Sequence, residues 1–238
     1  MSAAGTPPGP GSPAGVPDEL PATNAAAAPA KVNPALPLGQ PASASPPIVN
    51  IYTPSVAGTP LRQGEILTGI YQYRRSLASL RSQTHEIEEI EHPYAVVMSP
   101  DCDLEQDFAE RTDSVKKDAQ PDKLIPNILL LEAITVDELR ATTSPGKDIW
   151  KRIRQNKDER YHVLEDVPVN GDSDGKGLPA LGIDFKRYFT VPTDELHEQC
   201  GNTAKRRCYM ESPYAEHINR RFAEFLSRVA LPREHRIG

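Results

Sequence analysis

The sequence has few cysteines and no long apolar run. Three cysteines, Cys102, Cys200 and Cys208, occur in 238 residues. An odd number without a close pair does not fit a disulfide framework and favours a reducing compartment. No run approaches the ~20 apolar residues of a membrane span, and the first residues lack the basic start and apolar centre of a signal peptide. We therefore expect a soluble, cytoplasmic protein without a membrane partner.

The first fifty residues lack aromatic side chains and almost lack charge. They contain twelve of the 24 prolines and twelve alanines, but only three charged residues, Asp18, Glu19 and Lys31. Such a segment cannot bury enough apolar surface to offset the entropy lost on ordering it. We expect a disordered Pro/Ala-rich tail over residues 1–47 and one folded domain over residues 48–238.

Charge is unevenly distributed along the chain. The net charge of −6 argues against a protein that coats nucleic acid along its whole surface. Residues 85–113 hold ten acids and one base, whereas residues 147–160 hold six bases and three acids, and residues 200–238 hold eight bases and four acids. These charged segments can be ordinary solvent-exposed surface. Alternatively, they form a basic face for an anionic partner and an acidic lip.

Short apolar runs indicate β-strands, and turn residues separate them. The segment between the first two strands, residues 74–92, can be a hairpin excursion or a short helix. Residues 179–196 read as a pair of strands or as one strand with a bend. The predicted strands are 66–71, 94–98, 127–134, 161–164 and those within 179–196.

Helices are predicted at three places. One begins near Thr135 or Asp137, either of which can cap it, and a basic helix covers Ile149–Gln155. The clearest helix covers about residues 213–230, where apolar residues recur at spacings of three and four. Strands followed by a long amphipathic C-terminal helix predict a small α+β domain.

The segment Asp101-Cys102-Asp103 follows the second strand directly. Two flanking carboxylates disfavour the thiolate that a nucleophilic cysteine needs, so we expect Cys102 to be a buried structural thiol in an extended segment. Asp101 and Asp103 are weak candidates for binding Mg²⁺ or Mn²⁺, since such ions usually need more ligands than one local cluster supplies. No metal or other cofactor is expected.

Several segments, taken in chain order, resemble the PemK/MazF family. They are "GEIL" at 64–67, "HPYAVVMSP" at 92–100, "PNILLLEAIT" at 126–135, "YHVLE" at 161–165 and "LGIDFKRYFTVPTDEL" at 181–196. The phrases "SPDCDL" and "SPYAEHINRRFAEFLSRVALP" are also similar to a group of bacterial proteins without assigned function.

The resemblance implies an SH3-like β-barrel of a toxin–antitoxin type, often a homodimer, that cuts single-stranded RNA without a metal and is neutralised by an antitoxin peptide. Thr135 matches the family's hydroxyl residue at a strand end. His92 stands where the family has a catalytic arginine, and it could act as an acid or a base.

Two functions follow as hypotheses. In the first, the chain is an RNA-binding protein and a metal-independent endoribonuclease, with His92 and Thr135 as catalytic residues and Lys151, Arg152 and Arg154 as phosphate contacts. In the second, the same scaffold is a non-catalytic interaction or regulatory module, and its acidic lip binds a protein partner. A metal-dependent hydrolase would require Asp101 and Asp103 to meet a further acid or histidine.

Overall fold

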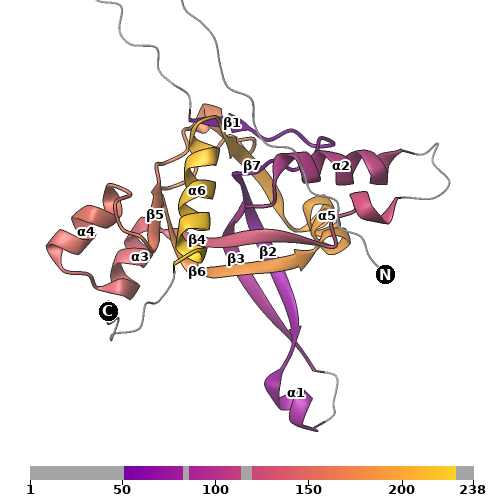
Figure 1. The fold of residues 1–238 in the computed structure, drawn as a ribbon, viewed down its shortest axis with the longest axis horizontal. Coiled ribbons are helices and arrows are strands. Elements are labelled where there is room, and N and C mark those ends of the chain that lie inside the picture. The colour runs from indigo at the N-terminus through magenta and orange to yellow at the C-terminus, as the bar shows by residue number, and fades with distance from the viewer. Residues whose placement is uncertain (1–50, 83–85, 114–119, 229–238) are drawn as a thin grey trace, which may run out of the picture. The chain divides into compact units, whose positions relative to one another are not determined.

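The computed structural model describes residues 51–82, 86–113 and 120–228 (Figure 1). The disordered tail predicted over residues 1–47 lies outside the described residues. Every described residue belongs to one unit, Pro47–Gly238. The predicted limits of the tail and of the folded domain, residues 1–47 and 48–238, stay a prediction.

Within the described residues, seven antiparallel strands form one sheet in the order β1-β7-β2-β3-β4-β6-β5. Together with the helices, this sheet confirms the α+β prediction. The strands are β1 (Tyr52–Pro54), β2 (Glu65–Arg75), β3 (Ile87–Val97), β4 (Asn127–Thr135), β5 (Tyr161–Leu164), β6 (Leu181–Pro192) and β7 (Lys205–Met210).

The sheet is open in the part of the chain that the structure describes, so it is not a closed barrel, and the predicted SH3-like form stays a prediction. Closure would require the edge strands β1 and β5 to pair with each other, and within the described residues they do not. Both edges are covered by other segments instead: a short 3₁₀ turn at Val169–Gly171 lies against β1, and helix α4 (Lys147–Arg154) lies against β5. Covering an edge protects its unpaired backbone groups without closing the sheet.

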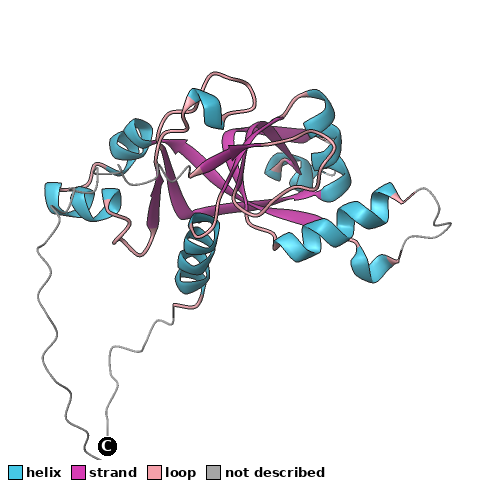
Figure 2. Cartoon of the chain, turned by 90° about the horizontal axis from the view of Figure 1, so that it is seen from above, coloured by secondary structure: helices cyan, strands magenta, loops and turns pink. Residues whose placement is uncertain are grey.

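Helices surround the strands, which lie in the middle of the domain in the view of Figure 2. In the described part of the chain, no helix is both long and apolar enough to cross a membrane. The remaining helices are α1 (Leu77–Ser82), α2 (Asp101–Thr112), α3 (Val136–Thr143), α5 (Thr193–Asn202) and α6 (Tyr214–Leu226).

The central strands are buried on both faces. Leu130 and Leu131 are neighbours in β4, yet they belong to different hydrophobic clusters, because successive side chains of a strand point to opposite faces. Helix α6 covers one cluster, and helices α2 and α5 cover the other through Leu104 and Leu196. Burial on both faces explains why these strands read as unbroken apolar runs in the sequence.

Helix α6 packs its apolar side on the sheet. The helix expected over about 213–230 runs from Tyr214 to Leu226. Ile218 and Phe222 are buried, and the ring of Phe222 lies 5.7 Å from that of Phe185 in β6. The helix therefore covers the chain's own core.

The segment between β2 and β3, left open by the sequence, is a hairpin that carries α1 near its tip (Figure 1). The two strands are longer than predicted, since Ile87–Glu91 also belongs to β3. The glutamates of this stretch, Glu88, Glu89 and Glu91, are exposed and lie on a two-stranded segment.

Asp101, Cys102 and Asp103 form the start of a helix, which corrects the prediction of an extended segment. Helix α2 begins at Asp101, directly after Pro100. Carboxylates in the first turn of a helix are stabilised by its dipole, which explains why acids gather there. Cys102 is exposed, so the prediction of a buried thiol at this position is wrong.

Candidate functional site

A large irregularity in the pairing of β4 with β6 creates a polar site. Leu131 pairs with Tyr188, and Ala133 pairs with Ile183. Between these pairs β4 advances by two residues (131 to 133) and β6 by five (183 to 188), so β6 carries three extra residues opposite Glu132. Bulges of this kind redirect side chains and are frequent beside functional sites.

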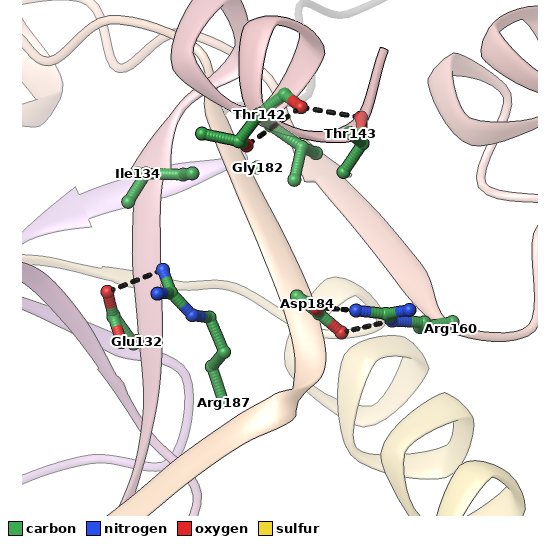
Figure 3. Close-up of a pocket in the computed structure, with 9 residues that line it drawn as sticks. Glu132, Ile134, Thr142, Thr143, Arg160, Gly182, Asp184 and Arg187 are labelled. Atoms are coloured by element: carbon green, nitrogen blue, oxygen red, sulfur yellow. Dashed lines mark hydrogen bonds and ion pairs between the residues drawn. The ribbon is translucent and has the colours of Figure 1, made fainter. Parts of the chain in front are cut away.

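The bulge opens a cavity of about 180 Å³, shown in Figure 3 and called the bulge cavity below. It lies between β4, β6 and α3. Helix α3 comes close because Gly182 has no side chain: a Cβ there would lie 2.5 Å from Leu139 Cδ2. The lining residues are Glu132, Ile134, Leu139, Thr142, Thr143, Arg160, Gly182, Asp184 and Arg187.

Two arginine–carboxylate pairs lie across this cavity. Arg187 Nη1 donates to Glu132 Oε1 at 3.0 Å, and Arg160 Nε donates to Asp184 Oδ1 at 2.7 Å. Arg160 and Asp184 form a second, parallel hydrogen bond, so their geometry is fixed. The Arg187 side chain is 54% exposed, whereas that of Arg160 is 38% exposed. Arg187 is therefore the cation of the cavity that a ligand reaches most easily.

Glu132 lies between Arg187 and His92. His92 Nδ1 is 3.7 Å from Glu132 Oε2, which is longer than a hydrogen bond, so their interaction is electrostatic. His92, and after it Arg187, lower the pKa of the Glu132 carboxyl, although burial acts in the opposite direction. Glu132 is consequently ionised at neutral pH and can accept a proton.

His92 is buried behind Glu132. It is 5% exposed, and its ring stacks on that of Phe189 with the centroids 3.8 Å apart. Neither ring nitrogen has a hydrogen-bond partner within the described residues. The predicted catalytic role of His92 stays a prediction, and its burial allows it to act only through Glu132.

Thr135 caps helix α3. Its Oγ1 accepts the Glu138 backbone N–H at 3.2 Å, while Glu138 Oε2 accepts the Thr135 backbone N–H at 2.9 Å. This reciprocal pair is a capping box. Thr135 does not line the bulge cavity, and no hydrogen bond joins it to His92 among the residues that the structure describes. Its predicted catalytic role also stays a prediction.

The three predicted phosphate contacts lie together on α4. Lys151, Arg152 and Arg154 are exposed, and within the described ranges none of them has an ion pair or a side-chain hydrogen bond. Beside them Trp150 is half-buried, with the guanidinium of Arg140 5.5 Å from its ring centroid.

Trp150, Arg140 and Arg154 line a second cavity of about 520 Å³, called the α4 groove below. Helix α3 separates the two cavities: Leu139 contributes to the bulge cavity and Arg140 to the α4 groove. The residues lining the α4 groove are Val136, Asp137, Arg140, Trp150, Arg154, Val163, Leu164, Glu165, Asp166 and Ala180.

The weak metal candidates have other partners. Asp101 Oδ1 accepts the Gln63 backbone N–H at 2.7 Å and pairs with Arg62 at 3.3 Å. Asp103 is exposed. In the described part of the chain, no three histidine, cysteine or carboxylate side chains converge to hold a metal ion. The convergence that a metal-dependent hydrolase would require at Asp101 and Asp103 is therefore missing there.

Sequence reasoning did not find Glu132, Asp184 and Arg187. A signal was present for each of them: Glu132 interrupts an apolar run, and Asp184 and Arg187 stand inside a long strand. Charged residues at such places indicate either pairing or function. A bend in this strand was one of two readings of the sequence, but the register against β4 that brings these residues together was not predictable from it.

No family model, no curated protein and no solved structure matches this chain. The resemblance to the PemK/MazF family therefore stays a prediction. What the site can do follows from its own residues.

Proposed function

We propose that this chain binds single-stranded RNA along α3 and α4. The observation that carries this proposal is the group of unpaired cations on α4 beside Trp150. Cations without carboxylate partners are free to neutralise phosphates, and an aromatic ring offers a surface on which a base stacks. The overall charge of −6 confines binding to this local basic surface.

The α4 groove fits a strand better than a duplex. Trp150 and Arg154 stand four residues apart on one side of α4, and the Arg140 guanidinium lies over one face of the ring. A base can stack on the other face while its phosphate meets Arg154, although Asp137, Glu165 and Asp166 also line the groove. Stacking on a ring requires an unpaired, accessible base, which single strands provide. The resemblance to the PemK/MazF family supports the same substrate class.

The second part of the proposal is that the RNA strand is cleaved, without a metal, at the bulge cavity. Glu132 takes the proton from a ribose 2′-hydroxyl, whose oxygen attacks the adjacent phosphorus. Arg187 neutralises the charge that develops on the phosphate. The P–O5′ bond breaks and the 5′-oxygen takes a proton from water, which leaves a 2′,3′-cyclic phosphate and a 5′-hydroxyl. His92 bears on this step only as the neighbour of Glu132, with its Nδ1 3.7 Å from Glu132 Oε2.

Fluorescence anisotropy with a labelled single-stranded RNA in EDTA tests binding. The variant Lys151→Ala/Arg152→Ala/Arg154→Ala should bind at least about tenfold more weakly than the wild type, because three phosphate contacts are lost. A control variant removes three positive charges elsewhere, at Lys123, Lys176 and Arg220, and should bind like the wild type. Equal affinity of both variants would disprove the proposed RNA surface.

Glu132→Gln tests cleavage. The amide keeps the shape of the side chain but cannot take a proton, so the RNA should stay bound and intact, whereas the wild type should produce cyclic phosphate ends. If the wild type binds RNA in EDTA and leaves it uncut, the cleavage part of the proposal is lost. The chain would then be a non-catalytic binding module.

A further inference from the structure

The β2–β3 hairpin projects beyond the rest of the sheet (Figure 1). The pairing of β2 with β7 ends at Thr68, and that of β3 with β4 ends at Tyr94. Farther out, residues 70–75 of β2 pair with residues 87–92 of β3. We call residues 71–75, helix α1 and residues 87–91 the arm. A two-stranded hairpin is marginally stable in water, so a projecting one favours a partner.

One face of the arm carries exposed apolar side chains. Tyr73 is 47% exposed and Ile87 is 72% exposed, while Leu77 at the start of α1 is 74% exposed. Tyr73 pairs with Glu89, and Ile87 lies two residues before Glu89 in β3, so these three side chains share a face. Large apolar residues gathered on a projecting element mark an interaction surface.

The same face is acidic. Glu89 and Glu91 are exposed and alternate with Ile90, so they point to the side that carries Tyr73 and Ile87. Neither glutamate has an ion pair within the described residues. Glu88, on the opposite face, is paired with Arg74 at 2.9 Å. Arg75, which is opposite Ile87 in the strand register, brings one positive charge to the same face, so the border of the apolar patch is negative on balance.

Helix α4 has the complementary character. Ile149 is 50% exposed, and Arg152, three residues later, lies on the same side of the helix, while Lys151 and Arg154 lie on its other sides. Two arms cannot pair through their acidic faces, because like charges would meet. The arm and α4 occupy separate extremities of the domain (Figure 1), so a single copy does not bring them together.

We infer that the arm of one copy docks on α4 of a second copy. The contact itself does not depend on the proposed function. Its consequence rests on that function, because self-association would cover the RNA-binding surface. Apolar contact between Tyr73, Ile87 and Ile149 and charge attraction between the glutamates and the α4 cations stabilise the contact. RNA and the second copy then compete for the same helix.

Two charge-reversal variants test the contact by sedimentation velocity over a wide range of protein concentration. Variant one is Glu89→Lys/Glu91→Lys on the arm, and variant two is Lys151→Glu/Arg152→Glu on α4. The wild type should self-associate, whereas each variant alone should associate about tenfold more weakly or not at all. An equimolar mixture should associate again, because each reversed arm meets a reversed α4 and each native arm meets a native α4.

A matched control reverses two exposed acids on α2, Asp103→Lys/Glu105→Lys. It changes the net charge as variant one does and should associate like the wild type. A monomeric wild type, a variant that associates like the wild type, or a mixture that stays monomeric would each overturn the inference. Circular dichroism checks that every variant is folded.

RNA binding separates this inference from the proposed function. Variant one keeps α4 intact, so at high protein concentration it should bind RNA more tightly than the wild type. Variant two should lose RNA binding. If neither variant nor the wild type binds RNA while the mixture still associates, the proposed function fails and the contact stands. If variant one binds RNA no more tightly than a wild type that self-associates, RNA and the second copy do not compete for α4.

Discussion

The arginines of β7 and the cations of α4 are two basic regions with opposite surroundings. Arg206 pairs with the buried Glu65, and Arg207 pairs with the buried Asp172. Arg152 and Arg154 on α4 are exposed and, among the described residues, have no carboxylate partner. A buried charge must be compensated within the protein, whereas an exposed one is compensated by water or by a ligand. The first region therefore stabilises the fold, and the second is available for binding.

The ion pair of Arg207 and Asp172 is buried. The arginine side chain is 9% exposed and the carboxylate 0%. Arg207 Nε donates to Asp172 Oδ1 at 2.8 Å, and the backbone N–H groups of Lys176 and Gly177 donate to Oδ2 at 3.0 and 2.9 Å. Asp172 thus holds β7 and the loop after Gly171 together.

Removing Asp172 should cause the largest effect. Asp172→Ala leaves Arg207 buried without a counter-charge, and we expect a loss of about 3–5 kcal/mol in the free energy of unfolding, measured by urea denaturation. The matched control is Glu224→Ala, which breaks the exposed pair with Arg220 and should cost at most about 0.5 kcal/mol. Equal losses in the two variants would contradict the assignment of a structural role to the buried pair.

The pH dependence of stability should show the same contrast. Arg207, with backbone N–H donors, holds the pKa of Asp172 far below its usual value. A depressed folded-state pKa contributes stability that is fully present above the unfolded pKa of about 3.9 and is lost as the pH falls below it. Thermal melts of the wild type should show falling stability below about pH 4. The variant Asp172→Asn, which is already destabilised, should lose less stability than the wild type over the same pH range. If both proteins lose the same amount, other carboxylates cause the acid sensitivity.

The sequence predicts elements with a strong local signal. Strand β5 begins and ends where expected, at Tyr161 and Leu164, and Thr135 caps α3 as its position before an acidic first turn indicates. Strand β7 was missed, because its sequence "KRRCYM" reads as a basic loop. Its burial depends on Asp172, more than thirty residues away, and no local pattern reports that partner.

The candidate site shows the same limit. Lys151, Arg152 and Arg154 were found because an exposed basic helix is visible in the sequence itself. The bulge cavity was not found, because it depends on three extra residues in the register of β6 against β4, which only the paired strands define. The burial of Asp172 was not found either, because the glycines around it are typical of an exposed turn.

A smaller effect is expected at Trp150, which belongs to the α4 region proposed to bind RNA. Trp150→Ala should weaken the binding of single-stranded RNA by about 1–3 kcal/mol, because one stacked base loses its platform. Trp150→Phe keeps a ring and should retain most of the affinity. Anisotropy titrations at constant salt measure both. If the phenylalanine variant binds as weakly as the alanine variant, Trp150 contributes something other than stacking.

The smallest effect on stability is expected for the variant Lys151→Ala/Arg152→Ala/Arg154→Ala. Because these side chains have no carboxylate partner in the described structure, their removal should change the free energy of unfolding by at most about 0.5 kcal/mol. The same variant should reduce the slope of log binding constant against log salt concentration by about 2, since each lost contact with a single strand contributes about 0.7. A large loss of stability with an unchanged slope would mean that the α4 cations, like Arg207, belong to the fold.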